Sequence, residues 1–160
     1  MKKFLDKSLI FLGAGVIALL VELLILNSSL QQLNVLTYLL TVGIIPAVML
    51  FVSLLLYSIT AKAPAKLTYV MAIVLALVFS GIMLAYCSAV VTPELMDTIL
   101  ANSITSENTQ VSMTAASTGD NIQSILMYTA FAGLGALVGN RIRRKKAPTP
   151  VVTAQDEYDN

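Results

Sequence analysis

Glu22 is the residue whose type and position most directly suggest chemistry, because it is the one acidic or basic side chain within four long apolar stretches of the sequence. A carboxylate inside a membrane is costly, and it usually binds a proton, a cation or another polar group there. On a helix centred near residue 17 or 18, Glu22 would lie about 7 Å from the membrane midplane, toward the outer side. From that depth its side chain can also extend to the outer interface, so a functional and a purely structural role both stay open.

Hydroxyl groups at a similar depth offer partners for this carboxylate. If the helices run antiparallel, Thr41, Tyr86 and Tyr128 fall near the level of Glu22 on the second, third and fourth apolar stretches. Their hydroxyls can donate hydrogen bonds to the carboxylate or share its proton. The sequence therefore predicts a candidate intramembrane polar site formed by Glu22, Thr41, Tyr86 and Tyr128.

The residue types that support most enzyme chemistry are missing. The sequence has no histidine, which is the commonest general base and a common metal ligand. Cys87 is the only cysteine, so neither an intramolecular disulfide nor a cysteine-rich metal centre can form. No nucleophile and base stand in a recognisable arrangement. We therefore expect no enzyme activity, no cofactor and no bound metal, and the net charge of +1 gives no reason to expect a nucleic-acid partner.

The elements that must position these residues are membrane helices. Hydrophobic residues make up 57% of the sequence and charged residues only 12%, whereas soluble domains have about 25% charged residues. Four apolar stretches, at 8–27, 35–59, 67–90 and 122–140, approach or exceed the roughly 20 residues that a helix needs to cross a bilayer. We expect an all-α integral membrane protein, folded as a four-transmembrane-helix antiparallel bundle. The first stretch has no clear cleavage site, so we expect a retained helix and not a signal peptide.

The distribution of basic residues predicts the orientation, because Lys and Arg stay on the cytoplasmic flanks of membrane helices. All ten fall on one side of four antiparallel helices. They are Lys2, Lys3, Lys7, Lys62, Lys66, Arg141, Arg143, Arg144, Lys145 and Lys146. The opposite segments, 27–34 and 91–121, contain no basic residue. We therefore predict a multi-pass protein of the bacterial inner (cytoplasmic) membrane with both termini in the cytoplasm.

The basic cluster after the fourth stretch has two interpretations. It can act as a topology anchor, or it can bind anionic lipid headgroups, to which each basic residue near the surface contributes about 1 kcal/mol. The candidate headgroup residues are Arg141, Arg143, Arg144, Lys145 and Lys146. The segment 147–160 contains two prolines and ends in a polar, acidic run, so we expect a flexible cytoplasmic tail after a membrane domain that spans 1–146.

The second outside loop, 91–121, divides into two parts. Thr92, Pro93 and Glu94 have the form of an N-cap, a proline in the first turn and an acidic first turn. Apolar residues then recur at helical spacing, at Leu95, Met96, Ile99, Leu100 and Ile104. This pattern predicts a short amphipathic, interfacial helix. The segment 106–121 is rich in Ser, Thr, Asn and Gly, which indicates a mobile linker or a loop ordered by a partner.

Two further patterns concern helix shape and packing. Pro46 lies near the centre of the second stretch, where it leaves the carbonyl of Val42 without its usual donor and predicts a kink.

The fourth stretch carries small residues on one face, at Ala132, Gly135, Ala136 and Gly139. Such a face permits a close helix contact, either within one chain or between two copies. The first stretch has a lesser version at Ala14 and Ala18, beside Gly13 and Gly15.

These features favour a non-catalytic membrane subunit, that is, a scaffold, assembly or accessory factor that binds other membrane proteins through its helices and outside loop. One alternative is an oligomeric channel, pore or small transporter that uses Glu22. Another alternative is a membrane immunity protein. The expected partners are the lipid bilayer and either other membrane subunits or further copies of this chain.

Overall fold

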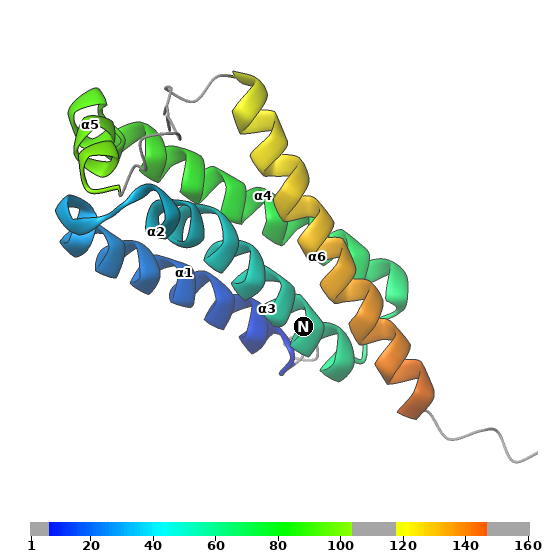
Figure 1. Ribbon diagram of the computed structural model, residues 1–160. Helices are drawn as coiled ribbons and strands as arrows, with labels where there is room; N and C mark the ends of the chain where they lie inside the picture. Colours follow the sequence, from blue (N-terminus) through cyan, green and yellow to red (C-terminus); the bar gives the residue numbers. More distant parts are fainter. Residues whose placement is uncertain (1–6, 104–117, 147–160) are drawn as a thin grey trace, which may run out of the picture.

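The computed structural model describes residues 7–103 and 118–146, and this part of the chain is helical without strands (Figure 1). Its elements are α1 (Leu9–Ser29), η1 (Leu30–Gln32), α2 (Val35–Leu39), η2 (Leu40–Ile44), α3 (Ile45–Thr60), α4 (Ala65–Val90), α5 (Pro93–Ala101) and α6 (Thr118–Lys146). The tail predicted at 147–160 and most of the linker predicted at 106–121 lie outside the described residues.

Four helical segments are long and apolar enough to cross a membrane, as the sequence predicts. They are Leu9–Gln32, Val35–Thr60, Ala65–Val90 and Asn121–Lys145. Large apolar side chains cover the outside of these helices; Ile10 and Leu24 on α1, for example, are 72% and 73% exposed. Such continuous apolar exposure is unfavourable in water and favourable in lipid. The described helices therefore indicate a multi-pass membrane protein in a bilayer.

The central helix of the packing is α3, which contacts α1, α4 and α6. The most extensive helix pair is α3 with α6, and α6 also runs along α4 (Figure 1). The core between the helices contains the fully buried Leu50, Leu54 and Phe79, together with Leu19 of α1. Two small residues of α6, Ala132 and Ala136, are also fully buried. The interior is thus built from large side chains of α3 and α4 and a small-residue face of α6.

The second span changes its hydrogen-bond pattern immediately before Pro46. The segment η2 is a π-helical turn in which the N–H of Ile45 donates to the carbonyl of Leu40, five residues earlier. Pro46 has no N–H and cannot bond the carbonyl of Val42. A π-helical turn is a known local form of such an interruption. The sequence predicts a kink at Pro46, and the structure has a π-helical turn directly before this residue, where α2 continues through η2 into α3.

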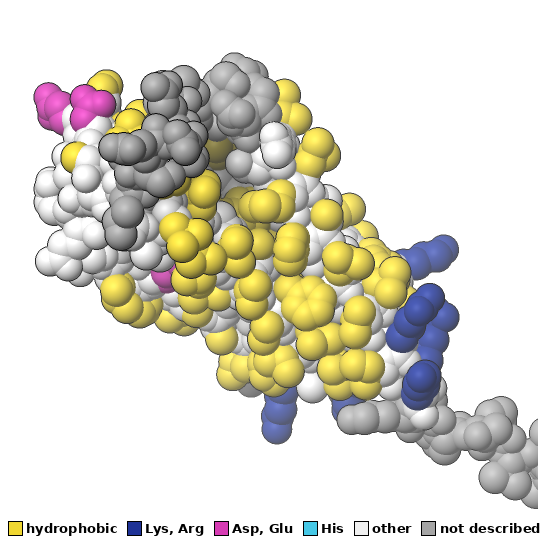
Figure 2. All heavy atoms as spheres, viewed as in Figure 1, with side chains coloured by type: hydrophobic (Ala, Val, Ile, Leu, Met, Phe, Trp, Pro, Cys, Tyr) yellow, Lys and Arg dark blue, Asp and Glu magenta, His cyan; other side chains and the backbone are white. Residues whose placement is uncertain are grey.

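Charge is segregated between the two ends of the molecule. Figure 2 shows Lys and Arg side chains gathered at one end and most of the visible Asp and Glu side chains at the other, with hydrophobic side chains between them. The first end, here called the basic end, contains the α3–α4 connection and the last turns of α6. The second, here called the α5 end, contains α5 with Glu94 and Asp97.

Candidate functional site

Glu22 is half-buried as a residue, and its carboxylate group points to the protein side of α1. Both of its oxygens are buried, and neither has a hydrogen-bond partner among the described residues. Leu19, Leu23 and Leu26 on the same helix are buried as well, so this side of α1 is the packed side. An ionised carboxylate is strongly disfavoured in such surroundings without a compensating charge or donor. An unpaired, ionised carboxylate is therefore unfavourable at this position.

The predicted partners of Glu22 separate into three cases. The hydroxyl of Tyr128 on α6 donates to the carbonyl of Val42 and not to Glu22. Tyr86 of α4 has a buried hydroxyl without a hydrogen-bond partner among the described residues. Thr41 donates to the carbonyls of Thr37 and Tyr38 in its own helix, at 2.8 and 3.2 Å. Among the described residues, Glu22 thus has no hydrogen bond to Thr41, Tyr86 or Tyr128.

Sequence reasoning missed two members of this polar region, Tyr38 and Cys87. Both residues are partly buried and pack against the hydrophobic core. The signal was present in the sequence, because Cys87 adjoins Tyr86 and Tyr38 lies one helical turn before the level of Glu22. The candidates for an intramembrane polar site are therefore Glu22, Tyr38, Tyr86, Cys87 and Tyr128, which come from α1, α2, α4 and α6. No group of three or more Cys, Asp or Glu side chains in the described part of the chain is arranged to hold a metal ion.

Tyr128 connects α6 to the interrupted helix. Its hydroxyl donates to the carbonyl of Val42 at 3.0 Å, and its side chain is 2% exposed. Val42 is the residue whose carbonyl Pro46 deprives of a donor. The bond satisfies a backbone group that would otherwise be unpaired in lipid. Because the Tyr128 hydroxyl donates its one proton to Val42, it could act toward any other group only as a hydrogen-bond acceptor.

The small-residue face of α6 packs against α3 of the same chain. A Cβ atom placed on Gly135 would lie 2.6 Å from the carbonyl oxygen of Phe51, and one on Gly139 would lie 2.6 Å from Cβ of Ser58. Ala132 and Ala136 are fully buried in this contact region. The glycines thus allow the backbones of α3 and α6 to approach closely, and the stripe is occupied by an intramolecular partner.

The small residue that α1 uses is Gly15. A Cβ atom on Gly15 would lie 2.9 Å from Cβ of Ser53 on α3, whereas one on Gly13 would meet open space. Ala14 is exposed and Ala18 is half-buried. The tight contact of α1 with α3 therefore passes through Gly15 and not through the Ala14 and Ala18 face.

At the basic end, a polar network ties α6 to the α3–α4 connection. The Arg143 guanidinium donates to the carbonyls of Ala61 and Ala63, at 2.6 and 2.8 Å. It also donates to Oδ1 of Asn140 at 2.9 Å. The Nδ2 atom of the buried Asn140 then donates to Oγ1 of Thr68 at 2.7 Å. Arg143 therefore has a structural role that its place in a basic cluster did not indicate.

The other described basic residues of α6 face outward. Arg141, Arg144 and Lys145 are exposed. They line a shallow surface pocket together with three apolar residues, Leu137, Val138 and Ile142. The side chain of Lys146 lies outside the described set. The predicted headgroup residues thus divide into an outward group of three and the inward Arg143.

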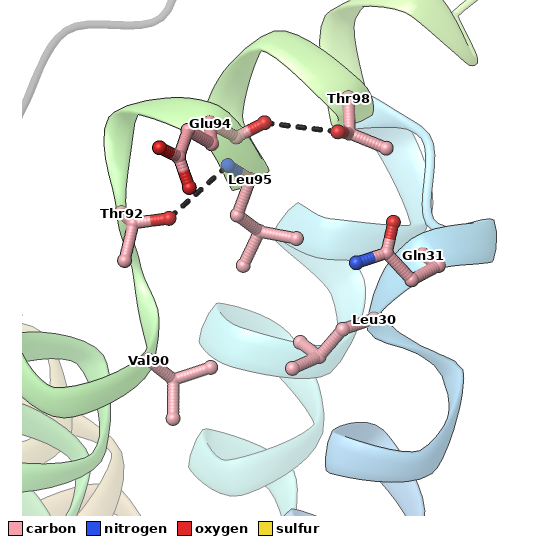
Figure 3. Close-up of a pocket in the computed structure, with 7 residues that line it drawn as sticks. All are labelled: Leu30, Gln31, Val90, Thr92, Glu94, Leu95 and Thr98. Carbon is pink, nitrogen blue, oxygen red and sulfur yellow. Dashed lines mark hydrogen bonds between the residues drawn. The ribbon is translucent and has the colours of Figure 1, made fainter.

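At the α5 end, a second pocket lies between the two loops of that end (Figure 3). Its lining residues are Leu30, Gln31, Val90, Thr92, Glu94, Leu95 and Thr98. In the close-up, the apolar side chains of Leu30, Val90 and Leu95 point toward one another and form its inner part. Thr92 caps α5 by accepting a hydrogen bond from the N–H of Leu95 at 3.2 Å. Glu94 is exposed at the edge of the pocket, so a carboxyl group and two threonines lie beside these apolar side chains.

Comparisons with known proteins do not assign this arrangement to a family. No protein-family model matches the chain, and neither the curated proteins nor the solved structures contain a match. A function has to be argued from the chemistry of the sites themselves.

Proposed function

We propose that this protein is a non-catalytic membrane subunit that binds another membrane protein through the acidic surface at its α5 end. The observation that carries the proposal is the direct bonding of α5 to the segment between α1 and α2. Two loops that are far apart in the sequence thereby form one preorganised surface. Preorganisation lowers the entropy lost on binding and is typical of recognition surfaces.

The bonds that join the two loops come from the end of α5. The Asn102 side chain donates to the carbonyls of Gln31 and Leu33, at 2.9 and 3.0 Å. The N–H of Val35 donates to Oγ of Ser103 at 3.0 Å. Beneath these bonds, Leu95 and Ile99 are buried against the bundle. The α5 helix is therefore fixed on the bundle by both polar and apolar contacts, as a binding platform requires.

The charge of this surface specifies the kind of partner. Glu94 and Asp97 are exposed on α5, and the sequence has no Lys or Arg in 8–61 or in 67–140. A partner with basic residues at the same level of the membrane surface complements this charge. Long-range attraction of this kind increases the association rate more than it increases affinity.

The proposal includes a membrane arrangement. The four helices span a bacterial inner membrane in antiparallel order, with α5 lying in the outer interface and both chain termini in the cytoplasm. The clustering of Lys and Arg at one end of the structure supports this orientation, because basic flanks remain cytoplasmic (Figure 2). The apolar residues of α5 that face the bundle and its exposed acidic residues support an interfacial position.

The test is crosslinking of the full chain in its native membrane. A photoreactive residue at Asp97 is expected to capture one defined membrane protein, whereas the same residue at Lys66, at the basic end, is not. The double substitution E94K/D97K should abolish this crosslink, and N102A should weaken it because α5 loses its bonds to the first loop. Equal crosslinking from Asp97 and Lys66, or capture that survives E94K/D97K, would overturn the proposal.

The Glu22 carboxylate favours a second candidate, a cation- or proton-coupled transporter or an oligomeric channel. A carboxylate buried without a described partner is typical of ion pathways in membrane proteins. The test is ion or proton flux into proteoliposomes that contain the full chain. E22Q should abolish the flux and E94Q should not; absence of flux in the unmodified protein excludes this candidate and leaves the first unaffected.

A further inference from the structure

The outward-facing pocket on the last turns of α6 has the chemistry of a phospholipid site. We propose that it binds one anionic phospholipid of the adjoining leaflet, with the phosphate-bearing headgroup on Arg141, Arg144 and Lys145 and an acyl chain along the apolar residues before them. This inference is independent of the protein partner proposed above.

The order of residues along α6 matches the polarity of a phospholipid. Leu134 and Leu137, 52% and 38% exposed, lie toward the middle of the helix. The pocket then continues through Val138 and Ile142 to the exposed Arg141, Arg144 and Lys145. An apolar surface that passes directly into a cluster of cations accommodates both an acyl chain and an anionic headgroup.

Within the described part of the chain, the lining of the pocket places no acidic residue beside its three cations. Arg143, in the middle of the same basic run, instead uses its guanidinium on Ala61, Ala63 and Asn140. Of the four described basic residues at the end of α6, three therefore line the outward pocket and Arg143 does not. Guanidinium groups bind phosphate oxygens in a two-point geometry, which favours a phosphate-bearing headgroup.

The experiment uses a single tryptophan as a local reporter. The sequence contains no tryptophan, so L134W places one such residue on the exposed face of α6 just before the pocket. The full chain with L134W is reconstituted in phosphatidylcholine vesicles that contain brominated phosphatidylglycerol or brominated phosphatidylcholine, and quenching by each lipid is measured. Phosphatidylglycerol should quench more strongly. Its relative binding constant should fall roughly fivefold for each pocket charge that is removed.

The variants distinguish a defined site from general surface charge. R144Q and the triple variant R141Q/R144Q/K145Q should lower the preference for phosphatidylglycerol, and R144Q alone decides the matter if the triple variant inserts incorrectly. K62Q/K66Q removes two charges from the same end outside the pocket and should leave the preference unchanged. Equal quenching by the two lipids, or an equal loss in K62Q/K66Q and R144Q, would overturn the proposal.

Discussion

The hydroxyl of Tyr128 donates a hydrogen bond to the carbonyl of Val42 and thereby satisfies the backbone group that Pro46 leaves without a donor. In water such a carbonyl would bond to solvent, but within a bilayer it needs a protein partner. The α6 helix supplies that partner from a residue 86 positions away in the sequence. The bond therefore links the interruption in the second span to the position of the fourth.

We expect Y128F to destabilise the protein by about 1 kcal/mol, the usual magnitude for a hydrogen bond between membrane helices. The variant should lose much less in a P46A background, where an N–H at position 46 can bond to Val42 directly. The measurement is a double-mutant cycle, with unfolding in mixed micelles followed by far-ultraviolet circular dichroism as the dodecyl sulfate fraction increases. Additive effects of Y128F and P46A would contradict this coupling.

The α3–α6 contact predicts different outcomes for three glycines on one helix. G135A and G139A should each destabilise the protein by roughly 1–3 kcal/mol, because the new methyl group meets backbone or Cβ atoms of α3 and forces the helices apart. G133A is the matched control, since its Cβ would meet nothing within 4 Å and alanine is the better helix former. The same micelle titration compares all three, and a destabilised G133A would show that glycine is needed here for another reason.

Two neighbouring arginines should differ sharply in their effect on stability. R143Q removes donors from the carbonyls of Ala61 and Ala63, which lie at the end of the α3 span, and it should destabilise the bundle by about 1–3 kcal/mol. R144Q removes the same charge from an exposed position and should change the unfolding free energy by less than about 0.5 kcal/mol. Amide hydrogen exchange at 61–63 should increase in R143Q only. Equal destabilisation by R143Q and R144Q would mean that the loss of a positive charge, and not the loss of the Arg143 hydrogen bonds, lowers the stability.

The sequence was sufficient to predict the four apolar spans, because hydropathy over about 20 residues is a strong signal. The close contact around Gly135 and Gly139 could also be predicted, although not that its partner is α3. Rotation of each helix about its axis could not be predicted, because it depends on packing between distant segments. For this reason Thr41 was expected beside Glu22, whereas the structure bonds Thr41 to its own helix.

The same limit applies to polar residues with several possible partners. Asn140 and Arg143 are adjacent on one face of α6, but their bonding to Thr68 and Ala61 depends on the approach of α4 and of the α3–α4 connection. Composition assigned Arg143 to the basic cluster, since a run of basic residues after an apolar span usually remains in the headgroup region. Only the contacts in the folded structure distinguish the bonded Arg143 from the exposed Arg144.

Replacement of Glu22 tests whether this carboxyl group lowers the stability of the folded protein. Its oxygens are buried without a described partner, and an apolar side chain of similar size avoids the desolvation of a carboxyl group. We therefore expect E22L to stabilise the protein by roughly 1–3 kcal/mol in the micelle titration. E22Q should gain less, because the buried amide still lacks hydrogen-bond partners.

A stabilised E22L would mean that the bundle folds better without its one intramembrane acid, as expected when a residue serves binding or transport and not packing. Comparison with E22Q separates the effect of the ionisable group from the effect of the unpaired polar atoms. Both variants remove the acid, and only leucine also removes the polar atoms. If E22L is less stable than the unmodified chain, Glu22 has a stabilising partner in the folded protein, and the carboxylate is then a structural element of the α1–α6 region. In that case the transporter candidate loses the observation on which it rests, and the binding surface at the α5 end is unaffected.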